Sequence, residues 1–287
     1  MPSAKELVDG CDTLVSLPEI YLRVREVIDD PDSSMDDLAN ALSLDPSMTA
    51  RVLQIVNSPL YGVPRKIDTL SQAVNLLGMR QVAHVVFATS VTKAFAKLPP
   101  TVMNMTEYWR KSVLCALIAV HLARAARIVD SERLFVAGLL RDVGHLVLYY
   151  QVPNRAQSAL IEAANFNQPL AEVEQANIGC DYTEVGGELM SKWGMPETLE
   201  EAVRYQLTPR ESPKAERDAA ILQIAGACAD HLEAHGDREA FPLQAMHDAL
   251  TLVRLVPSDL QILIGQAQTQ LRETLAVIYP AAMTMAA

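Results

Sequence analysis

Residues 45–59, with the sequence DPSMTARVLQIVNSP, contain both ends of one helix and its buried face. Asp45 can cap the helix, and Pro46 already has the backbone φ of a first helical residue. Apolar side chains follow at three- and four-residue spacing. Pro59 stops the helix, because proline disfavours helical geometry in the residue before it. The segment therefore predicts an amphipathic helix that begins at Pro46 and ends at Asn57-Ser58.

The same apolar spacing recurs along nearly the whole chain, and no segment shows sustained two-residue alternation. A helix is expected over 69–77, closed by Gly78 in a left-handed conformation, and another over 81–97. Further helices are expected over 106–128, 131–149, 154–165, 169–176, 181–193, 196–206, 218–235, 242–253 and 257–279. The sequence therefore predicts an all-α fold.

Pro99-Pro100 is the strongest internal break in this helical pattern. It predicts an N-terminal helical half over residues 1–98 and a second helical unit over 99–217. A polar stretch with two prolines, from Thr208 to Arg217, reads as a loop. The helices of residues 218–287 are then expected to form a C-terminal extension packed on the same module.

Composition limits the class of protein. The chain has 287 residues, half of them hydrophobic, which is enough for a large core. Acidic residues outnumber basic ones 35 to 24 and the basic ones are scattered, which disfavours nucleic acid as a partner. Four widely separated cysteines predict reduced core thiols. No leader or membrane-spanning run is seen, so we expect a cytoplasmic protein with no membrane partner.

Several motifs together resemble the HDOD family, bacterial signalling proteins related to the HD phosphohydrolases. The motifs are DPSMT at 45–49, VNSPLYG at 56–62, AVNLLG at 73–78, YWRKS at 108–112, AGLLRDVG at 137–144 and KWGMP at 192–196. The resemblance covers about residues 10–210. It implies a multi-helical fold in which an N-terminal helical layer packs on an HD-like helical unit, here residues 99–217.

The resemblance also implies a degenerate metal pocket. HD hydrolases bind divalent ions through histidines and aspartates, and the flanking motifs align other residues at most of those positions. The aligned residues are Lys111, Arg141, Asp142, Tyr182, Tyr205 and Gln206, with Gly226 near the expected final aspartate. A cation held about 4 Å from a divalent ion would cost about 8 kcal/mol at an effective dielectric constant of about 20. We therefore expect no catalytic residue, no metal and no cofactor, and expect Asp142 to pair with Arg141, Lys111 or a helix-terminal amide.

Function follows from the same resemblance. It implies a non-catalytic signal-transduction module that acts through contacts with other signalling proteins, of two-component or cyclic-dinucleotide systems. One alternative is a divergent phosphohydrolase that recruits His145, Asp181 or Glu184 as metal ligands. Another is a nucleotide or anion sensor in which Lys111 and Arg141 hold a phosphate. Homo-oligomerisation stays open.

Asn57, Ser58, Tyr61 and Gly62 form a polar and aromatic turn directly after the first quoted helix. Asparagine tolerates unusual backbone geometry, and tyrosine joins an apolar ring to a hydrogen-bonding end. We expect this turn to be structural and to pack against the HD-like unit. The alternative is an exposed recognition surface.

Overall fold

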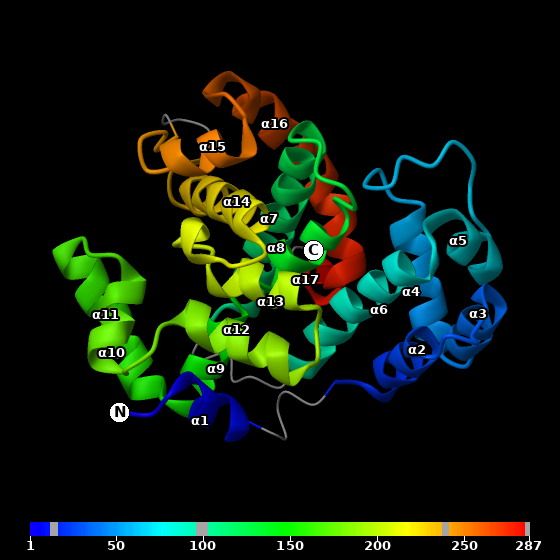
Figure 1. The fold of residues 1–287 in the computed structure, drawn as a ribbon, viewed down its shortest axis with the longest axis horizontal. Coiled ribbons are helices and arrows are strands. Elements are labelled where there is room, and N and C mark those ends of the chain that lie inside the picture. The colour runs from blue at the N-terminus through cyan, green and yellow to red at the C-terminus, as the bar shows by residue number, and fades with distance from the viewer. Residues whose placement is uncertain (12–16, 96–102, 237–240, 285–287) are drawn as a thin grey trace. The chain divides into compact units, whose positions relative to one another are not determined.

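The computed structural model describes residues 1–11, 17–95, 103–236 and 241–284, and every described element is a helix (Figure 1). The all-α prediction is confirmed. The chain forms two compact units, each assembled from two stretches of sequence. The larger unit comprises Met1–Val15 and Leu98–Ile264, and the smaller comprises Ser16–Lys97 and Gly265–Ala287.

The smaller unit packs its helices around α6, which contacts α2, α4 and α5. Phe87 of α6 is fully buried, and its ring lies 4.7 Å from that of Tyr21 on α2. The helices of this unit are α2 (Glu19–Asp29), α3 (Met35–Ser43), α4 (Pro46–Val56), α5 (Leu70–Leu77), α6 (Met79–Ala94), the C-terminal part of α16 (Pro257–Ile278) and α17 (Ala281–Thr284).

Helix boundaries in this unit follow the sequence signals. The Asp45 carboxylate accepts from the backbone N–H of Met48 at 3.0 Å, and α4 ends at Val56, as predicted. Thr69 caps α5 in the same way. Gly78 has a positive φ of 82° but a ψ of 159°, so the expected left-handed helical conformation is wrong. The Pro99-Pro100 break lies outside the described residues.

The larger unit is built around α7, which packs against α8 and α14 (Figure 1). Nearly every residue of α7 from Tyr108 to Ala123 is buried, as expected for a helix that is covered on all sides. The elements of this unit are α1 (Ala4–Asp9), α7 (Met105–Ala125), α8 (Arg133–Leu140), α9 (Val143–Gln151), α10 (Pro153–Phe166), α11 (Leu170–Asn177), α12 (Tyr182–Lys192), α13 (Glu197–Arg204), the 3₁₀ helix η2 (Pro209–Glu211), α14 (Glu216–His235), α15 (His247–Val253) and the start of α16.

The single helix expected over 131–149 is wrong, because the chain breaks at Arg141-Asp142 between α8 and α9. Apolar residues continue through this point, so the periodicity carries no stop signal. The Arg141 carbonyl accepts instead from Nε2 of Gln206 at 2.9 Å, a side chain 65 residues away. A tertiary contact therefore stabilises the break, and the break aims two charged side chains inward.

The two observed units do not follow the three consecutive parts that the sequence predicts, which are residues 1–98, 99–217 and 218–287. Residues 1–15 belong to the larger unit, where α1 lies against α9 and α12. Lys192 donates to the carbonyl of Val8 at 3.2 Å, and Gln151 donates to Cys11 Sγ at 3.0 Å. The expected extension over 218–287 is itself divided, with its last residues, from Gly265, in the smaller unit.

All four cysteines are buried free thiols, as the sequence predicts. Burial raises the pKa of the Cys115 and Cys228 thiols to about 12, so neither is a ready nucleophile. Within the described segments, no helix combines the length and the apolarity that crossing a bilayer demands.

The turn after α4 is organised by Asn57. Its amide Nδ2 donates to the carbonyls of Leu53 and Ile67, both at 2.7 Å, and its Oδ1 accepts from the backbone N–H of Ile67 at 2.7 Å. Ser58 is buried, Tyr61 is half-buried and Gly62 is exposed with a φ of 57°. Asn57 thus closes the loop from α4 to α5 within the smaller unit. Packing of the turn against the larger unit stays a prediction.

Asn57→Ala should lower the free energy of unfolding by roughly 1–3 kcal/mol, because it leaves the polar backbone groups of Ile67 unpaired. Asn75→Ala is the matched control, since Asn75 is exposed and donates to the Ser71 carbonyl one helical turn away. That control should stay within about 0.5 kcal/mol of wild type. Urea denaturation measures both, and equal midpoints for Asn57→Ala and wild type would contradict the structural role.

Close helix contact at Gly144 brings α9 and α12 together. A Cβ at this position would lie 2.0 Å from the Tyr182 carbonyl oxygen and 2.7 Å from the backbone nitrogen of Gly186. Backbone atoms cannot move aside as a flexible side chain can. Glycine at position 144 therefore sets the spacing of two helices that carry residues of the site described below.

Gly144→Ala should lower the free energy of unfolding by about 1–3 kcal/mol, because α9 and α12 must move apart to make room for the added Cβ. Gly265→Ala in α16 should do the opposite and stabilise by about 0.5–1 kcal/mol, since nothing lies within 4 Å of its added Cβ. Thermal unfolding of both variants measures the contrast. Equal shifts in the same direction would show that helix spacing at Gly144 is not the constraint.

Candidate functional site

Four charged side chains converge inside the larger unit. Lys111 comes from α7, Arg141 and Asp142 come from the turn between α8 and α9, and Asp230 comes from α14. Lys111 Nζ lies 3.0 Å from Asp142 Oδ2 and 2.9 Å from Asp230 Oδ1. Arg141 contacts the second oxygen of each carboxylate. Its Nε lies 3.5 Å from Asp142 Oδ1, and its Nη2 lies 3.0 Å from Asp230 Oδ2.

The four groups form a ring of alternating charge, which we call the ion ring (Lys111, Asp142, Arg141, Asp230). Each carboxylate gives one oxygen to the lysine and the other to the arginine. Two positive and two negative groups cancel, so the ring carries no net charge. Neutrality matters because Arg141 and Asp142 are only 7% and 4% exposed, and an unpaired buried charge costs several kcal/mol.

Burial and charge act in opposite directions on the pKa values of the ring. Burial favours a neutral Asp142, but Arg141 and Lys111 outweigh it and hold its pKa well below the usual range. Asp142 raises the pKa of Lys111 despite the burial of the ammonium, with further help from Asp230. Burial would also lower the pKa of Arg141, and the two carboxylates raise it well above its usual range. All three groups therefore stay ionised near pH 7.

Gln206 and Gly226 position Arg141. Gln206 is fully buried, and its Oε1 accepts from Arg141 Nε at 2.7 Å while its Nε2 donates to the Arg141 and Val203 carbonyls. A Cβ on Gly226 would lie 2.3 Å from Arg141 Cζ. Glycine therefore makes the room that the guanidinium fills, and the position aligned near an expected aspartate holds no side chain at all.

His145 lies beside the ring in an aromatic stack. Its imidazole is 4.1 Å from the Tyr182 ring and 5.7 Å from the Tyr149 ring, measured between centroids. Its Nδ1 lies 3.1 Å from Oε1 of the buried Glu174, although the contact lacks hydrogen-bond geometry. The second oxygen of Glu174 accepts from the backbone N–H of Tyr182 at 3.0 Å. Burial raises the pKa of Tyr182, so its phenol stays neutral.

A pocket of about 350 Å³ opens above these groups. The four ring residues, His145 and Tyr182 line its polar side, and Pro169, Leu170, Ala171 and Leu207 line its apolar side. Of the six residues aligned from the sequence, Tyr205 does not line it and instead lines a neighbouring groove with Asp181 and Glu184. Gln206 does not line the pocket either, and it holds Arg141 in place by hydrogen bonds to the guanidinium and to the backbone carbonyl.

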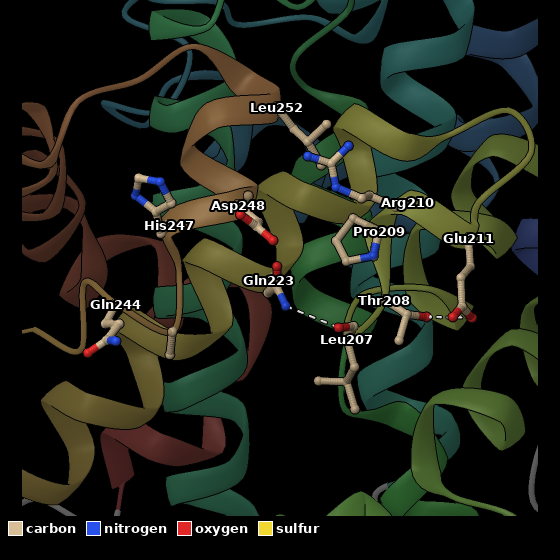
Figure 2. Close-up of a pocket in the computed structure, with 12 residues that line it drawn as sticks. Leu207, Thr208, Pro209, Arg210, Glu211, Gln223, Gln244, His247, Asp248 and Leu252 are labelled. Carbon is tan, nitrogen blue, oxygen red and sulfur yellow. Dashed lines mark hydrogen bonds between the residues drawn. The ribbon is translucent and has the colours of Figure 1, made fainter.

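A second pocket, of about 420 Å³, lies between η2, α14 and α15 (Figure 2). Gln223 of α14 donates to the Leu207 carbonyl at 3.1 Å, and Thr208 donates to Glu211. Its charged side chains, Arg210, Glu211 and Asp248, are exposed. Because no ionised group is buried there, the pocket at the ion ring is the stronger candidate site.

The sequence between residues 14 and 209 matches the HDOD domain. The chain belongs to the HDOD family. Its fold is similar to that of an HDOD domain protein of unknown function from Geobacter sulfurreducens, with a TM-score of 0.70, 23% identity and coverage of 96% of each chain.

Two further structures share the fold at 23% identity. One, from Shewanella amazonensis SB2B, is provisionally named a phosphohydrolase, with a TM-score of 0.73 and coverage of 93% of this HDOD chain and 97% of the other. Another, from Marinobacter aquaeolei VT8, is provisionally named a signal transduction protein, with a TM-score of 0.68 and coverage of 96% and 61%. At this identity the likeness shows the fold alone.

A curated relative from Treponema pallidum (strain Nichols), an uncharacterized protein, is 23% identical over 215 residues. The match spans 74% of this HDOD protein and 41% of the relative, so the chain spans about two fifths of that relative's length. The relative therefore extends well beyond the matched region.

The resemblance to HD phosphohydrolases implies a divalent metal at this position, and the residues present do not fit one. Both carboxylates are already in contact with Lys111 and Arg141, and neither cation can ligate a metal ion. Across the described ranges, no group of three or more His, Cys, Asp or Glu side chains is placed to hold a metal. The arrangement is chemically an ion-pair network.

Sequence reasoning missed Asp230 and Glu174. Asp230 stands one helical turn after Gly226 on α14, so both lie on the same helix face. That spacing is the signal that could have found Asp230, once Gly226 was placed in the pocket. Glu174 gives no such signal, because only the tertiary fold brings α11 against His145 and Tyr182.

Asp142→Asn should flatten the acid dependence of stability. Because the folded-state pKa of Asp142 is lowered, its contribution is complete above the unfolded value of 3.8 and is lost as the pH falls below it. Between about pH 4 and pH 2 the free energy of unfolding of wild type should fall more steeply than that of the variant, by up to about 1.4 kcal/mol per pH unit. Urea denaturation across this range measures both curves, and parallel curves would contradict the buried ionised Asp142.

Proposed function

We propose that this HDOD protein is a non-catalytic regulatory module of bacterial signal transduction that acts through contacts with other proteins. The observation that carries the proposal is the ion ring, in which both carboxylates contact Lys111 and Arg141. Hydrolysis of phosphate esters by HD-type enzymes needs a metal to lower the pKa of an attacking water. Here Lys111 and Arg141 neutralise the two carboxylates that would attract such an ion.

The side chains near the pocket also favour the non-catalytic role over a divergent phosphohydrolase. Asp181 and Glu184, two candidate alternative ligands, form the capping box of α12, with Asp181 accepting from the N–H groups of Thr183 and Glu184. His145 contacts Glu174 and two tyrosine rings. These residues are already used to hold helices together.

The ion ring argues equally against a nucleotide or anion sensor. A phosphate at Lys111 or Arg141 would lie beside the carboxylates of Asp142 and Asp230, which would repel it. The charge of the whole chain, −11, adds to that repulsion. A protein partner is the remaining class, and the provisional name of the Marinobacter aquaeolei VT8 structure agrees with a signalling role.

The purified chain should hydrolyse bis(p-nitrophenyl) phosphate and cyclic dinucleotides at no more than the buffer rate, with Mg²⁺, Mn²⁺ or Zn²⁺ added. Asp142→Ala should give the same rate as wild type, since neither has a metal-activated water. Release of nitrophenolate and chromatography of the nucleotides measure the reaction. Metal-dependent turnover that disappears in Asp142→Ala would overturn the non-catalytic role.

The protein-contact part of the proposal has its own measurement. Cross-linking of the tagged chain in growing cells, followed by mass spectrometry, should identify a signalling protein, and calorimetry with that purified partner should give a saturable heat of binding. Binding should persist in Asp142→Asn if the contact surface lies outside the pocket. Failure of every cross-linked candidate to bind when purified would contradict action through protein contacts.

A further inference from the structure

A groove of about 760 Å³ lies next to the ion-ring pocket in the larger unit, and we call it the acidic groove. Four carboxylates line it, one from α11, two from the start of α12 and one from η2: Glu172, Asp181, Glu184 and Glu211. Tyr205 and Leu207 add apolar surface. A hollow of this size accommodates several side chains of a bound segment.

The carboxylates of the acidic groove have no cation to balance them. Asp181 and Glu184 form the capping box of α12, so they accept from backbone N–H groups there. Glu211 accepts from the Thr208 hydroxyl (Figure 2). Among the residues that the structure describes, none forms an ion pair with any of the four carboxylates. Burial raises the pKa of Glu184, and the nearby Asp181 raises it further.

Of the residues described at the groove, Arg204 is the one cation, and its charge is balanced elsewhere. Its Nη2 lies 2.8 Å from Glu200 and 3.6 Å from Glu188, neither of which lines the groove. Its Nη1 donates to the backbone carbonyl of Glu184 at 3.4 Å. The groove therefore keeps a negative charge and attracts a positively charged occupant, as does the whole chain with its net charge of −11.

Leu207 gives the groove an apolar contact point. Its side chain is 40% exposed, and it also lines the ion-ring pocket and the pocket of Figure 2. A large aliphatic side chain exposed between adjoining hollows favours a contact that removes it from water. A metal ion would supply the positive charge without this contact. The occupant that fits both features carries a cation next to an apolar group.

We infer that the acidic groove binds a segment of a partner protein in which a lysine or arginine stands next to an apolar side chain. The cation would lie among Glu172, Asp181 and Glu184. The apolar side chain would lie against Leu207, beside Tyr205. This inference rests on the proposed action through protein contacts, and it names the chemistry of the contact. It leaves the ion ring intact.

A peptide array tests the inference, with the full tagged chain as the probe. The array holds random nonapeptides in which basic and acidic residues are equally frequent. Wild type should select peptides with a lysine or arginine next to a leucine, isoleucine, methionine or phenylalanine. Calorimetry with one selected peptide gives its Kd, and added salt should weaken the binding because the charges at the groove are open to solvent.

Glu172→Gln/Glu184→Gln removes two charges from the groove and should keep the fold. Glutamine can replace glutamate in the capping box, and Glu172 is exposed. Affinity for the selected peptide should fall about five- to tenfold. The matched control is Glu107→Gln/Glu216→Gln, which removes the same charge at the starts of α7 and α14, away from the groove. The control should bind the peptide as wild type does.

Leu207→Ala tests the apolar contact. It should weaken binding of the selected peptide, but not of a peptide in which alanine replaces the apolar residue. The two changes should therefore be non-additive, as expected for groups in contact. Additive losses would place the apolar residue of the peptide elsewhere and would contradict the assignment of Leu207.

Three results would overturn the inference. The first is a wild-type array with no preference for basic over acidic peptides. The second is an equal loss of affinity in the groove variant and in the control, which would reduce the binding to general charge attraction. The third is binding of spermidine as tight as that of the selected peptides at the same ionic strength, which would make the occupant a small cation.

The inference and the proposed function fail by different results. A cross-linked partner that binds wild type and Glu172→Gln/Glu184→Gln equally would leave the protein-contact role standing and would remove the acidic groove from it. Metal-dependent turnover would overturn the non-catalytic role and would not change the peptide preference.

Discussion

The contact of the Lys111 ammonium group with two carboxylates, the buried Asp142 and the half-exposed Asp230, is the constraint on which the larger unit depends. Lys111, Asp142 and Asp230 come from α7, the α8–α9 turn and α14. Each of the two ion pairs, Lys111–Asp142 and Lys111–Asp230, would alone gain on the order of 5 kcal/mol of Coulomb energy at an effective dielectric constant of about 20, before desolvation. Desolvation takes most of that gain, so the ring specifies how three elements meet more than it adds net stability.

Small residues allow those elements to meet. Gly226 leaves the space that the Arg141 guanidinium occupies, Gly144 lets α9 approach α12, and Gly138 lets α8 approach the backbone of α7 at Ala116. A Cβ at Gly138 or Gly144 would meet the backbone of a neighbouring helix, and one at Gly226 would displace the Arg141 guanidinium. The charged side chains of the pocket are therefore paired with one another. This pairing supports the proposed non-catalytic role.

Local signals in the sequence predicted local structure well. The capping residues Asp45 and Thr69 start α4 and α5 where the sequence places them, because such caps act within one helical turn. The break at Arg141-Asp142 could not be predicted in this way, since Gln206 stabilises it from a distant part of the chain. The assignment of residues 1–15 and 265–287 depends on tertiary packing for the same reason. Aligning the motifs placed Lys111, Arg141 and Asp142 at one site. Asp230 could be assigned to that site only from the orientation of α14 in the fold.

Anomalous diffraction from crystals grown in excess Mn²⁺ is the most direct measurement of the ion ring. The expected map has Lys111 Nζ within hydrogen-bonding distance of both Asp142 and Asp230, with no anomalous peak between the two carboxylates. An anomalous peak at that point, with Lys111 turned into solvent and Mn²⁺ in contact with both carboxylates, would contradict an internal cation. The pocket would then be a metal-binding site, as in metal-dependent phosphohydrolases.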